Sequence, residues 1–254
     1  MTNRYKKILN IRQKLSKGGY SIGSWMQIPN TSIAEVMGHA GYDWIAIDME
    51  HGAIGAHQLP DLFRSIELGD SLPLARLAQG HPKDCKQALD AGAGGVIIPM
   101  VESAEQLIII RDACRWPPSG SRGVGFSRAN LFGRNFESYK KEAQSPLFIV
   151  MIESILAVEN LDSILSVEGI DAVFIGPYDL SASMNLMGEF ENSKFIEVMT
   201  KIKITSDQKN IPCGVHIIEP SESEMSKKID SGYRFIAYSM DSVFLNKSVL
   251  NPLR

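Results

Sequence analysis

The sequence has 254 residues, of which 44% are hydrophobic and 22% are charged, and its formal net charge is −3 at pH 7. This length fits one large domain of ordinary water-soluble composition. The weak negative charge gives no electrostatic reason to expect nucleic acid or an anionic membrane as a partner, and no apolar run approaches the roughly 18–20 residues of a membrane span.

The amino terminus and the cysteines indicate a reducing compartment. Residues 1–18 are basic and polar and contain no apolar segment typical of a signal peptide. The three cysteines, Cys85, Cys114 and Cys213, are odd in number, scattered and without CxxC spacing. These features argue against a disulfide framework or a thiolate zinc site. We therefore expect a cytoplasmic protein.

One signal occurs four times along the chain: a glycine that ends a helix, followed by a short apolar run. It is centred on Gly41, Gly92, Gly169 and Gly232. A glycine just beyond a helix takes the left-handed conformation that caps it, and the apolar run is typical of a parallel strand buried on both faces. The pattern predicts repeated strand–helix units.

The predicted elements alternate along the whole chain. Strands are predicted at residues 21–27, 44–48, 72–76, 95–100, 147–152, 172–175, 213–217 and 234–238. Helices are predicted at residues 3–17, from 29–32 onward, at 57–68, 82–91, 104–114, 136–143, 155–165 and 192–209, and from about 242. Eight strands trailed by helices predict a single (β/α)8 barrel domain over residues 1–254. The alternative is an open doubly wound sheet, which places its ligand at one switch point, whereas here polar residues follow several strands.

Polar residues collect where the predicted strands end. Asp48 and His51 follow the second strand, Arg76 ends the third, Glu153 follows the fifth and Asp179 follows the sixth. In a barrel, the carboxyl ends of all strands face one mouth, where active sites lie. Neighbouring parallel strands are roughly 4.8 Å apart, so the two acids after adjacent strands can converge on one divalent cation. Together these residues predict a metal-assisted acid–base site.

Each of these residues also has an ordinary structural interpretation. Glu153 and Asp179 are acids of the kind favoured at a helix start. Arg76 is typical of a surface ion pair, and Asp48 of a turn residue that accepts backbone hydrogen bonds. His51 lies in a glycine-containing loop, where histidines are usually exposed. In a barrel, however, all of these residues would lie at the same mouth, which chance alone does not readily explain.

Several motifs carry a resemblance to a known family. They are Gly23-Ser-Trp25, Asp48-x-Glu-His51, Arg122-Gly-Val-Gly, Ile-Glu153 and Gly176-Pro-x-Asp179-Leu-Ser. Over about residues 20–240, and in the same order, the chain resembles the HpcH/HpaI family of metal-dependent class II pyruvate aldolases. The resemblance implies a barrel of the phosphoenolpyruvate/pyruvate-binding type. It also implies a homo-oligomer, a hexamer built as a trimer of dimers, with the C-terminal helix exchanged between subunits.

The resemblance implies a metal and substrate site at the mouth. Glu153 and Asp179 would bind Mg²⁺ or Mn²⁺, with Co²⁺ or Zn²⁺ as further candidates, and pyruvate or a close 2-oxo acid would chelate the ion. The segment Gly176, Pro177 and Tyr178 would seat the substrate carboxylate, because amides at a helix start suit an anion.

The resemblance also implies the groups that move charge and protons. Arg76 would hold the keto oxygen and stabilise the enolate. His51, oriented by Asp48, would be the acid–base group, since a histidine has a near-neutral pKa.

Four further positions bear on the substrate. Met151 and Tyr178 depart from the family pattern, which typically has Gln and a small residue there, so they are expected to influence specificity. Trp25 is expected to wall the pocket. Arg122, in the loop of residues 117–130, is expected to hold the distal end of the acceptor aldehyde; the alternative is a structural loop at a subunit interface.

We predict a metal-dependent aldolase that reversibly cleaves a 4-hydroxy-2-oxo acid into pyruvate, or a close 2-oxo acid, and an aldehyde. One alternative is an acyl-CoA lyase, for which the sequence has no clear long basic groove. A second is an oxaloacetate decarboxylase that uses the same enolate chemistry. A third is a non-catalytic barrel, against which the joint presence of His51, Arg76, Glu153 and Asp179 argues.

Overall fold

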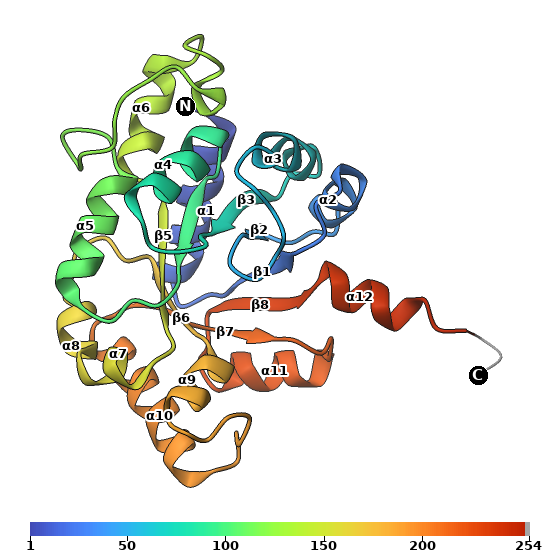
Figure 1. Cartoon of the computed structure of the whole chain (residues 1–254), viewed down its shortest axis with the longest axis vertical. Coiled ribbons are helices and arrows are strands. Elements are labelled where there is room, and N and C mark those ends of the chain that lie inside the picture. The colour runs from blue at the N-terminus through green and yellow to red at the C-terminus, as the bar shows by residue number, and fades with distance from the viewer. Residues whose placement is uncertain (252–254) are drawn as a thin grey trace.

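Eight parallel strands pair in chain order and close into a barrel in the computed structural model, which describes residues 1–251 (Figure 1). The strands are β1 (Ser21–Met26), β2 (Trp44–Asp48), β3 (Leu72–Arg76), β4 (Gly95–Ile98), β5 (Leu147–Ile152), β6 (Ala172–Ile175), β7 (Cys213–Ile217) and β8 (Phe235–Met240). The predicted (β/α)8 barrel is therefore confirmed. Residues 252–254 of the predicted domain lie outside the described residues.

Helices alternate with these strands. They are α1 (Asn3–Ser16), α2 (Thr31–Gly38), α3 (Leu59–Leu68), α4 (Pro82–Ala91), α5 (Ala104–Cys114), the 3₁₀ turn η1 (Arg128–Asn130), α6 (Phe136–Gln144), α7 (Ile155–Glu159), α8 (Leu161–Ile164), α9 (Pro177–Ser183), α10 (Ser193–Gln208), α11 (Glu222–Asp230) and α12 (Asp241–Ser248). Within residues 1–251, no helix is long and apolar enough to cross a membrane.

Two predicted boundaries are wrong for identifiable reasons. The helix predicted at residues 155–165 is two short helices, because the chain breaks at Asn160, whose amide donates to the carbonyl of Glu102 at 2.9 Å. The fourth strand ends at Ile98 rather than Met100. Pro99 has no N–H to continue the ladder, and Met100 takes a left-handed conformation with φ 50°.

Side chains along each strand point alternately into the barrel interior and toward the helices that surround it. Inward residues form one cluster: Trp25, Trp44, Ala46, Leu72, Leu74, Ile97, Leu147, Ile149, Met151, Ala172, Phe174, Phe235 and Ala237. Successive strand residues point to opposite faces, so the next inward positions fall at the carboxyl ends of the strands. Those positions are occupied by Gln27, Asp48, Arg76, Glu153 and Gly176. The two-residue alternation that places apolar side chains inside the barrel therefore also places a layer of polar side chains at its mouth.

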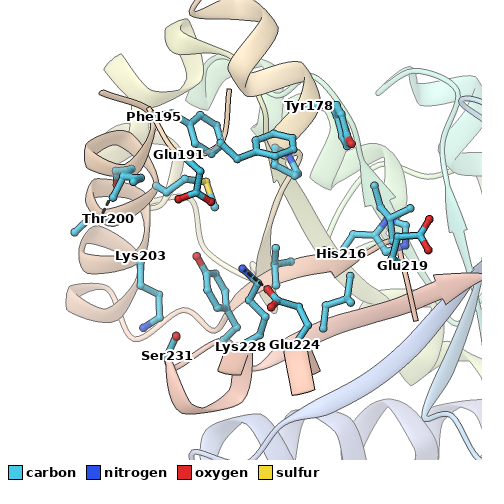
Figure 2. Close-up of a pocket in the computed structure, with 18 of the residues that line it drawn as sticks. Tyr178, Glu191, Phe195, Thr200, Lys203, His216, Glu219, Glu224, Lys228 and Ser231 are labelled. Carbon is cyan, nitrogen blue, oxygen red and sulfur yellow. Dashed lines mark hydrogen bonds and ion pairs between the residues drawn. The ribbon is translucent and has the colours of Figure 1, made fainter. Parts of the chain in front are cut away.

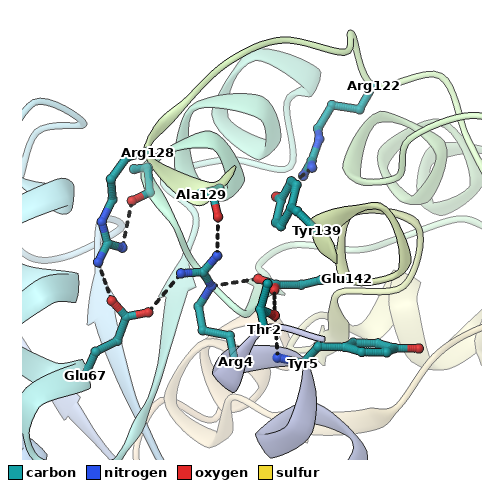
Figure 3. Close-up of polar contacts among 10 residues, drawn as sticks. Thr2, Arg4, Tyr5, Glu67, Arg122, Arg128, Ala129, Tyr139 and Glu142 are labelled. Carbon is teal, nitrogen blue, oxygen red and sulfur yellow. Dashed lines mark hydrogen bonds and ion pairs between the residues drawn. The ribbon is translucent and has the colours of Figure 1, made fainter. Parts of the chain in front are cut away.

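The opposite end of the barrel is closed by α1 and a polar network (Figure 3). Ile8, Ile11 and Leu15 of α1 join the interior cluster. Arg4 donates to Glu142 Oε1 at 2.6 Å and to Glu67 Oε1 at 3.0 Å. A buried charge is tolerated only when it is paired and hydrogen-bonded, and Arg4 meets this condition. Substrate access is therefore from the other end.

The last helix is placed unlike the others. Figure 1 shows α12 projecting from the end of β8 away from the barrel. Leu245, Val249 and Leu250 are exposed by 48%, 63% and 75%. Leu245 lies on α12, and the other two follow its end at Ser248. Apolar side chains gathered in water in this way mark an interaction surface.

Candidate active site

Arg76 and Asp48 form the best-defined pair at the mouth. The guanidinium donates through Nε to Asp48 Oδ1 at 2.9 Å and through Nη2 to Oδ2 at 2.7 Å. Its Nη1 lies 3.1 Å from Glu50 Oε2, and its Cζ lies 4.6 Å from the centre of the Trp25 ring. Two hydrogen bonds to one carboxylate fix the position of the guanidinium within its own plane. Packing against the indole ring restrains its movement out of that plane.

Asp48 orients Arg76 and the following loop, and it contacts His51, which it was expected to orient, through the backbone of that residue. Its Oδ1 accepts from the backbone N–H groups of Glu50 and His51 at 3.1 and 3.2 Å. Burial acts to raise the pKa of Asp48, but the hydrogen bonds and charge of Arg76 outweigh it and lower that pKa. Asp48 therefore stays ionised as the partner of Arg76.

His51 stands at the rim of the mouth. Its side chain is 58% exposed, and its Nε2 lies 4.0 Å from Glu50 Oε2. The carboxylate next to the imidazole is thus Glu50, which the Asp-x-Glu-His run contained but which we had given no role. This arrangement leaves the ring free to meet a substrate at the rim.

The side chain of Glu153, just after β5, is held by a backbone hydrogen bond and fits beside Gly176. Its Oε1 accepts from the N–H of Met100 at 2.6 Å, a residue that follows Pro99 just after the end of β4. A β-carbon on Gly176 would lie 2.5 Å from Glu153 Oε2. Glycine at 176 is therefore what lets this carboxylate lie against the start of α9, which carries Asp179 in its first turn.

Three acids share this region. Burial and the charges of Glu50 and Asp179 raise the pKa of Glu153 to about 7, against the hydrogen bond from Met100. Burial also raises the pKa of Glu50, with smaller opposing effects from Arg76 and His51. Such crowding of carboxylates marks functional sites. Among residues 1–251, no three His, Cys, Asp or Glu side chains are grouped as a metal site, so any ion would draw other ligands from water or substrate.

Tyr178 forms an aromatic wall beside the acids. It is 51% exposed, and its ring lies edge-on to Phe190 with 4.9 Å between centroids. A cavity of about 780 Å³ between α10 and α11 lies beyond this wall. Figure 2 shows Tyr178 and His216 at one side of the cavity, with Lys203 and Ser231 at the other. Glu153 and Arg76 do not line it, so this cavity adjoins the acidic mouth without being part of it.

Trp25 and Met151 lie below the mouth rather than in an open pocket wall. Each is only 2% exposed and belongs to the interior cluster. Trp25 supports Arg76 from beneath, and Met151 lies two residues before Glu153 on the same face of β5. Both therefore lie one layer beneath the residues that line the mouth.

The prediction that Arg122 holds an aldehyde is wrong for its own subunit. Arg122 is 2% exposed and donates to the carbonyl of Cys114 at 3.1 Å and to the Tyr139 hydroxyl at 2.9 Å (Figure 3). Cys114 ends α5, at the level of the strand amino termini and so away from the mouth. The other arginine of this loop, Arg128, is paired with Glu67.

His216 is an interior histidine near the end of β7. Its Nε2 lies 3.1 Å from the carbonyl of Ser239, and its ring is edge-on to Trp25 at 5.9 Å. The Nε2–H tautomer donates to that carbonyl. Burial lowers the pKa of His216 from 6.5 to about 4.

This histidine predicts an acid-sensitive fold. Between pH 6.5 and about 4, the unfolded chain binds a proton at His216 that the native protein does not, so the free energy of unfolding decreases as pH falls through this window. The contribution is at most about 3 kcal/mol. In urea denaturation at about pH 7 and about pH 5, His216→Asn should lose less stability on acidification than the wild type. An equal loss in both proteins would show that this histidine does not contribute.

Besides Glu50, two participants were missed by sequence reasoning. Gln27 donates to Asp48 Oδ2 at 2.9 Å, and Met100 orients Glu153 through its main chain. Gln27 had a usable signal, because it is a polar residue two positions after Trp25 at the end of a predicted strand. Met100 had none, since its contribution does not depend on its side chain.

Comparisons with known proteins find aldolases that match almost the whole chain. A hydroxypyruvate/pyruvate aldolase from Roseobacter denitrificans is 37% identical over 238 residues, covering 92% of this chain and 91% of that protein. A 4-hydroxy-2-oxovalerate aldolase from Novosphingobium aromaticivorans is 34% identical over 251 residues, covering 96% and 93%. A crystal structure of an HpcH/HpaI aldolase/citrate lyase family protein from Burkholderia cenocepacia superposes with a TM-score of 0.88 at 29% identity, covering 94% and 95%.

The family assignment rests on nearly the whole barrel. The family model described as HpcH/HpaI aldolase/citrate lyase matches residues 21–248, from the first strand to the last helix. That range includes the acids, Arg76 and His51. The chain therefore belongs to the HpcH/HpaI aldolase/citrate lyase family, and this membership together with its aldolase relatives indicates a carbon–carbon lyase.

Proposed function

We propose that this protein is a divalent-metal-dependent aldolase that reversibly cleaves a 4-hydroxy-2-oxo acid into pyruvate, or a close 2-oxo acid, and an aldehyde. The observation that carries the proposal is the meeting of a rigidly held Arg76 with the acids Glu153 and Asp179 at the open end of the barrel. The aldolase activities named for the relatives support the same reaction class.

The donor set fits a hard divalent cation. Glu153, Asp179 and Glu50 offer only oxygen atoms, and the charge of Asp179 adds to burial in raising the pKa of Glu153 and of Glu50. Within residues 1–251, the buried Oε2 of Glu50 accepts no hydrogen bond, although it forms an ion pair with Arg76 Nη1 at 3.1 Å. Mg²⁺ and Mn²⁺ suit one or two carboxylates completed by water and substrate oxygens. Glu153 and Asp179 would hold the ion, which supplies Lewis-acid stabilisation of charge on the substrate's keto oxygen.

The remaining steps belong to side chains of the mouth. Arg76 donates to the keto oxygen and stabilises the enolate as its charge develops. The amides of Tyr178 and Asp179, in the first turn of α9, have no partner within the helix and suit the substrate carboxylate. His51 removes the C4 hydroxyl proton during cleavage and returns a proton to the CH₂ carbon of the enolate, which becomes the methyl group of pyruvate. Glu50 Oε2 lies 4.0 Å from Nε2 of this histidine.

Exchange of pyruvate methyl protons with deuterated water tests this proposal. Enolisation alone produces exchange, so the assay needs no knowledge of the aldehyde. We expect exchange with Mn²⁺ or Mg²⁺ and its loss on addition of EDTA, and a panel of aldehydes then identifies the acceptor. Oxaloacetate decarboxylation and acyl-CoA cleavage are the two rival outcomes, each measured directly. No exchange with any of the candidate ions would overturn the aldolase proposal.

We also propose that α12 is exchanged between subunits of a homo-oligomer. The support is the exposed Leu245 on the helix, the exposed Val249 and Leu250 that follow its last residue, Ser248, and the projection of α12 away from the barrel (Figure 1). Leu245→Asp is expected to lower the mass measured by light scattering at a fixed concentration, because it places a charge in the buried contact. Asn246→Asp adds the same charge at a polar position and serves as the control. A wild-type monomer, or an unchanged mass for Leu245→Asp, would contradict the exchange.

A further inference from the structure

A continuous set of hydrogen bonds joins the first turn of α12 to the Asp48–Arg76 pair. Ser242 Oγ lies 3.2 Å from Gln27 Oε1, and Gln27 Nε2 lies 2.9 Å from Asp48 Oδ2. Asp48 in turn holds Arg76 by two hydrogen bonds. The segments involved are more than 200 positions apart in sequence, since Gln27 and Ser242 are separated by 215.

The chemistry of the partners fixes the direction of each bond. The Asp48 carboxylate only accepts, so Gln27 must present its NH₂ group to it. The amide oxygen of Gln27 then faces Ser242, whose hydroxyl must donate. Ser242 thereby sets which way the Gln27 amide points. A reversed amide would place its oxygen against the Asp48 carboxylate.

The backbone around Gln27 is held by the same turn of α12. Asp241 is only 4% exposed. Its Oδ1 accepts from the N–H of Gln27 at 2.9 Å and its Oδ2 from the N–H of Ile28 at 2.9 Å. Oδ1 also accepts from the N–H of Ser242 at 2.7 Å. The loop after β1 and the start of α12 are therefore one clamped unit, and Gln27 is restrained in both main chain and side chain.

Gln27 differs from the other partners of Asp48. Asp48 accepts five hydrogen bonds: two from Arg76, two from the backbone of its own loop and one from Gln27. The Gln27 contact is the one that leads outside the mouth. It occupies Oδ2, the same oxygen that Arg76 Nη2 approaches at 2.7 Å. A change at Gln27 therefore acts directly on the plane in which the Asp48–Arg76 fork lies.

We infer that Gln27, held in orientation by Ser242, is a positioning residue that sets the Asp48–Arg76 pair for the enolate step. This role rests on the proposed function. Gln27 touches no reacting atom itself, and it acts by keeping the guanidinium aimed at the keto oxygen. Small displacements of such groups are costly, because the donor must match the position where charge develops.

Variants at Gln27 and Ser242 distinguish a role in positioning the Asp48–Arg76 pair from a role in packing alone. Gln27→Met keeps the length of the side chain without its hydrogen bonds and is expected to lower kcat for pyruvate exchange about 10-fold, with Mn²⁺ affinity kept within about twofold. Ser242→Ala is expected to lower kcat about threefold. Gln27→Lys restores a donor to Asp48 and is expected to recover most of the Gln27→Met loss. Ser248→Ala, which removes a hydroxyl on the same helix that bonds Phe244 O, is the matched control.

Crystal structures of Gln27→Met and Ser242→Ala supply a readout that does not depend on turnover. We expect the Arg76 guanidinium to rotate away from Asp48 Oδ2 in both variants and to stay in place in Ser248→Ala. Unchanged Asp48–Arg76 geometry would overturn the inference, as would wild-type kcat in both variants. If the wild type shows no exchange at all, the proposed reaction fails, and the inference that Gln27 orients Asp48 for that reaction fails with it. The crystallographic comparison then still shows whether Gln27 holds the pair.

Discussion

Replacing Glu153 by Gln is expected to lower the affinity for Mn²⁺ by about 100-fold or more, because it removes one of two charged ligands. Pyruvate exchange should fall in parallel. Isothermal titration with Mn²⁺ measures the first effect, and deuterium exchange measures the second. Glu105→Gln, at an exposed acid in the first turn of α5, is the control and should bind Mn²⁺ as the wild type does.

The same substitution is expected to stabilise the metal-free protein. Burial and the charges of Glu50 and Asp179 disfavour the ionised Glu153 carboxylate, so a neutral amide of the same shape removes an unfavourable interaction. Thermal unfolding in EDTA at mildly alkaline pH should give a higher Tm for Glu153→Gln than for the wild type. A purely structural acid predicts the opposite: a lower Tm and unchanged Mn²⁺ binding. That result would refute the ligand assignment.

Arg76→Met is expected to lower pyruvate exchange by about 10³-fold, since one preorganised donor to a developing oxyanion contributes about that much. Mn²⁺ affinity should persist, because Arg76 is not a ligand. The variant leaves Asp48 buried without its main partner, which can cost about 3–5 kcal/mol of stability. Its Tm must therefore be measured alongside its activity.

Arg76→Lys is the companion that keeps the charge. Lysine is a point charge without the planar fork, so it can pair with Asp48 but cannot make both hydrogen bonds and donate to a substrate together. We expect a folded protein that has lost about 100-fold of its exchange rate. Full exchange in Arg76→Lys would show that only the charge matters, and full exchange in Arg76→Met would remove Arg76 from the mechanism.

The barrel and its polar mouth were predictable because they depend on local periodicity. Apolar runs of period two and helix-ending glycines predicted the eight strands. The same alternation carried Asp48, Arg76 and Glu153 to one layer, so their convergence needed only the barrel. Most strand boundaries agreed with the predictions to within two residues.

The choice of partners was not predictable, because it depends on contacts between distant segments. Asp48 was expected to orient His51; it accepts from the backbone N–H of His51 and makes its two side-chain bonds at the mouth with Arg76, because the register between β2 and β3 pairs Asp48 with Arg76. Arg122 was expected at a substrate and lies against Tyr139. The break at Asn160 follows from a carbonyl 58 positions away. None of these contacts can be predicted from the few residues on either side of the positions involved.

The left-handed turn at Met100 has a consequence for protein engineering. Its main-chain N–H fixes Glu153, while its side chain is 47% exposed. Position 100 can therefore be randomised without deleting the contact that orients this acid, provided the new residue tolerates a positive φ, as glycine and asparagine do. A library at this position would vary the rim of the mouth while the acid beneath it stays in place.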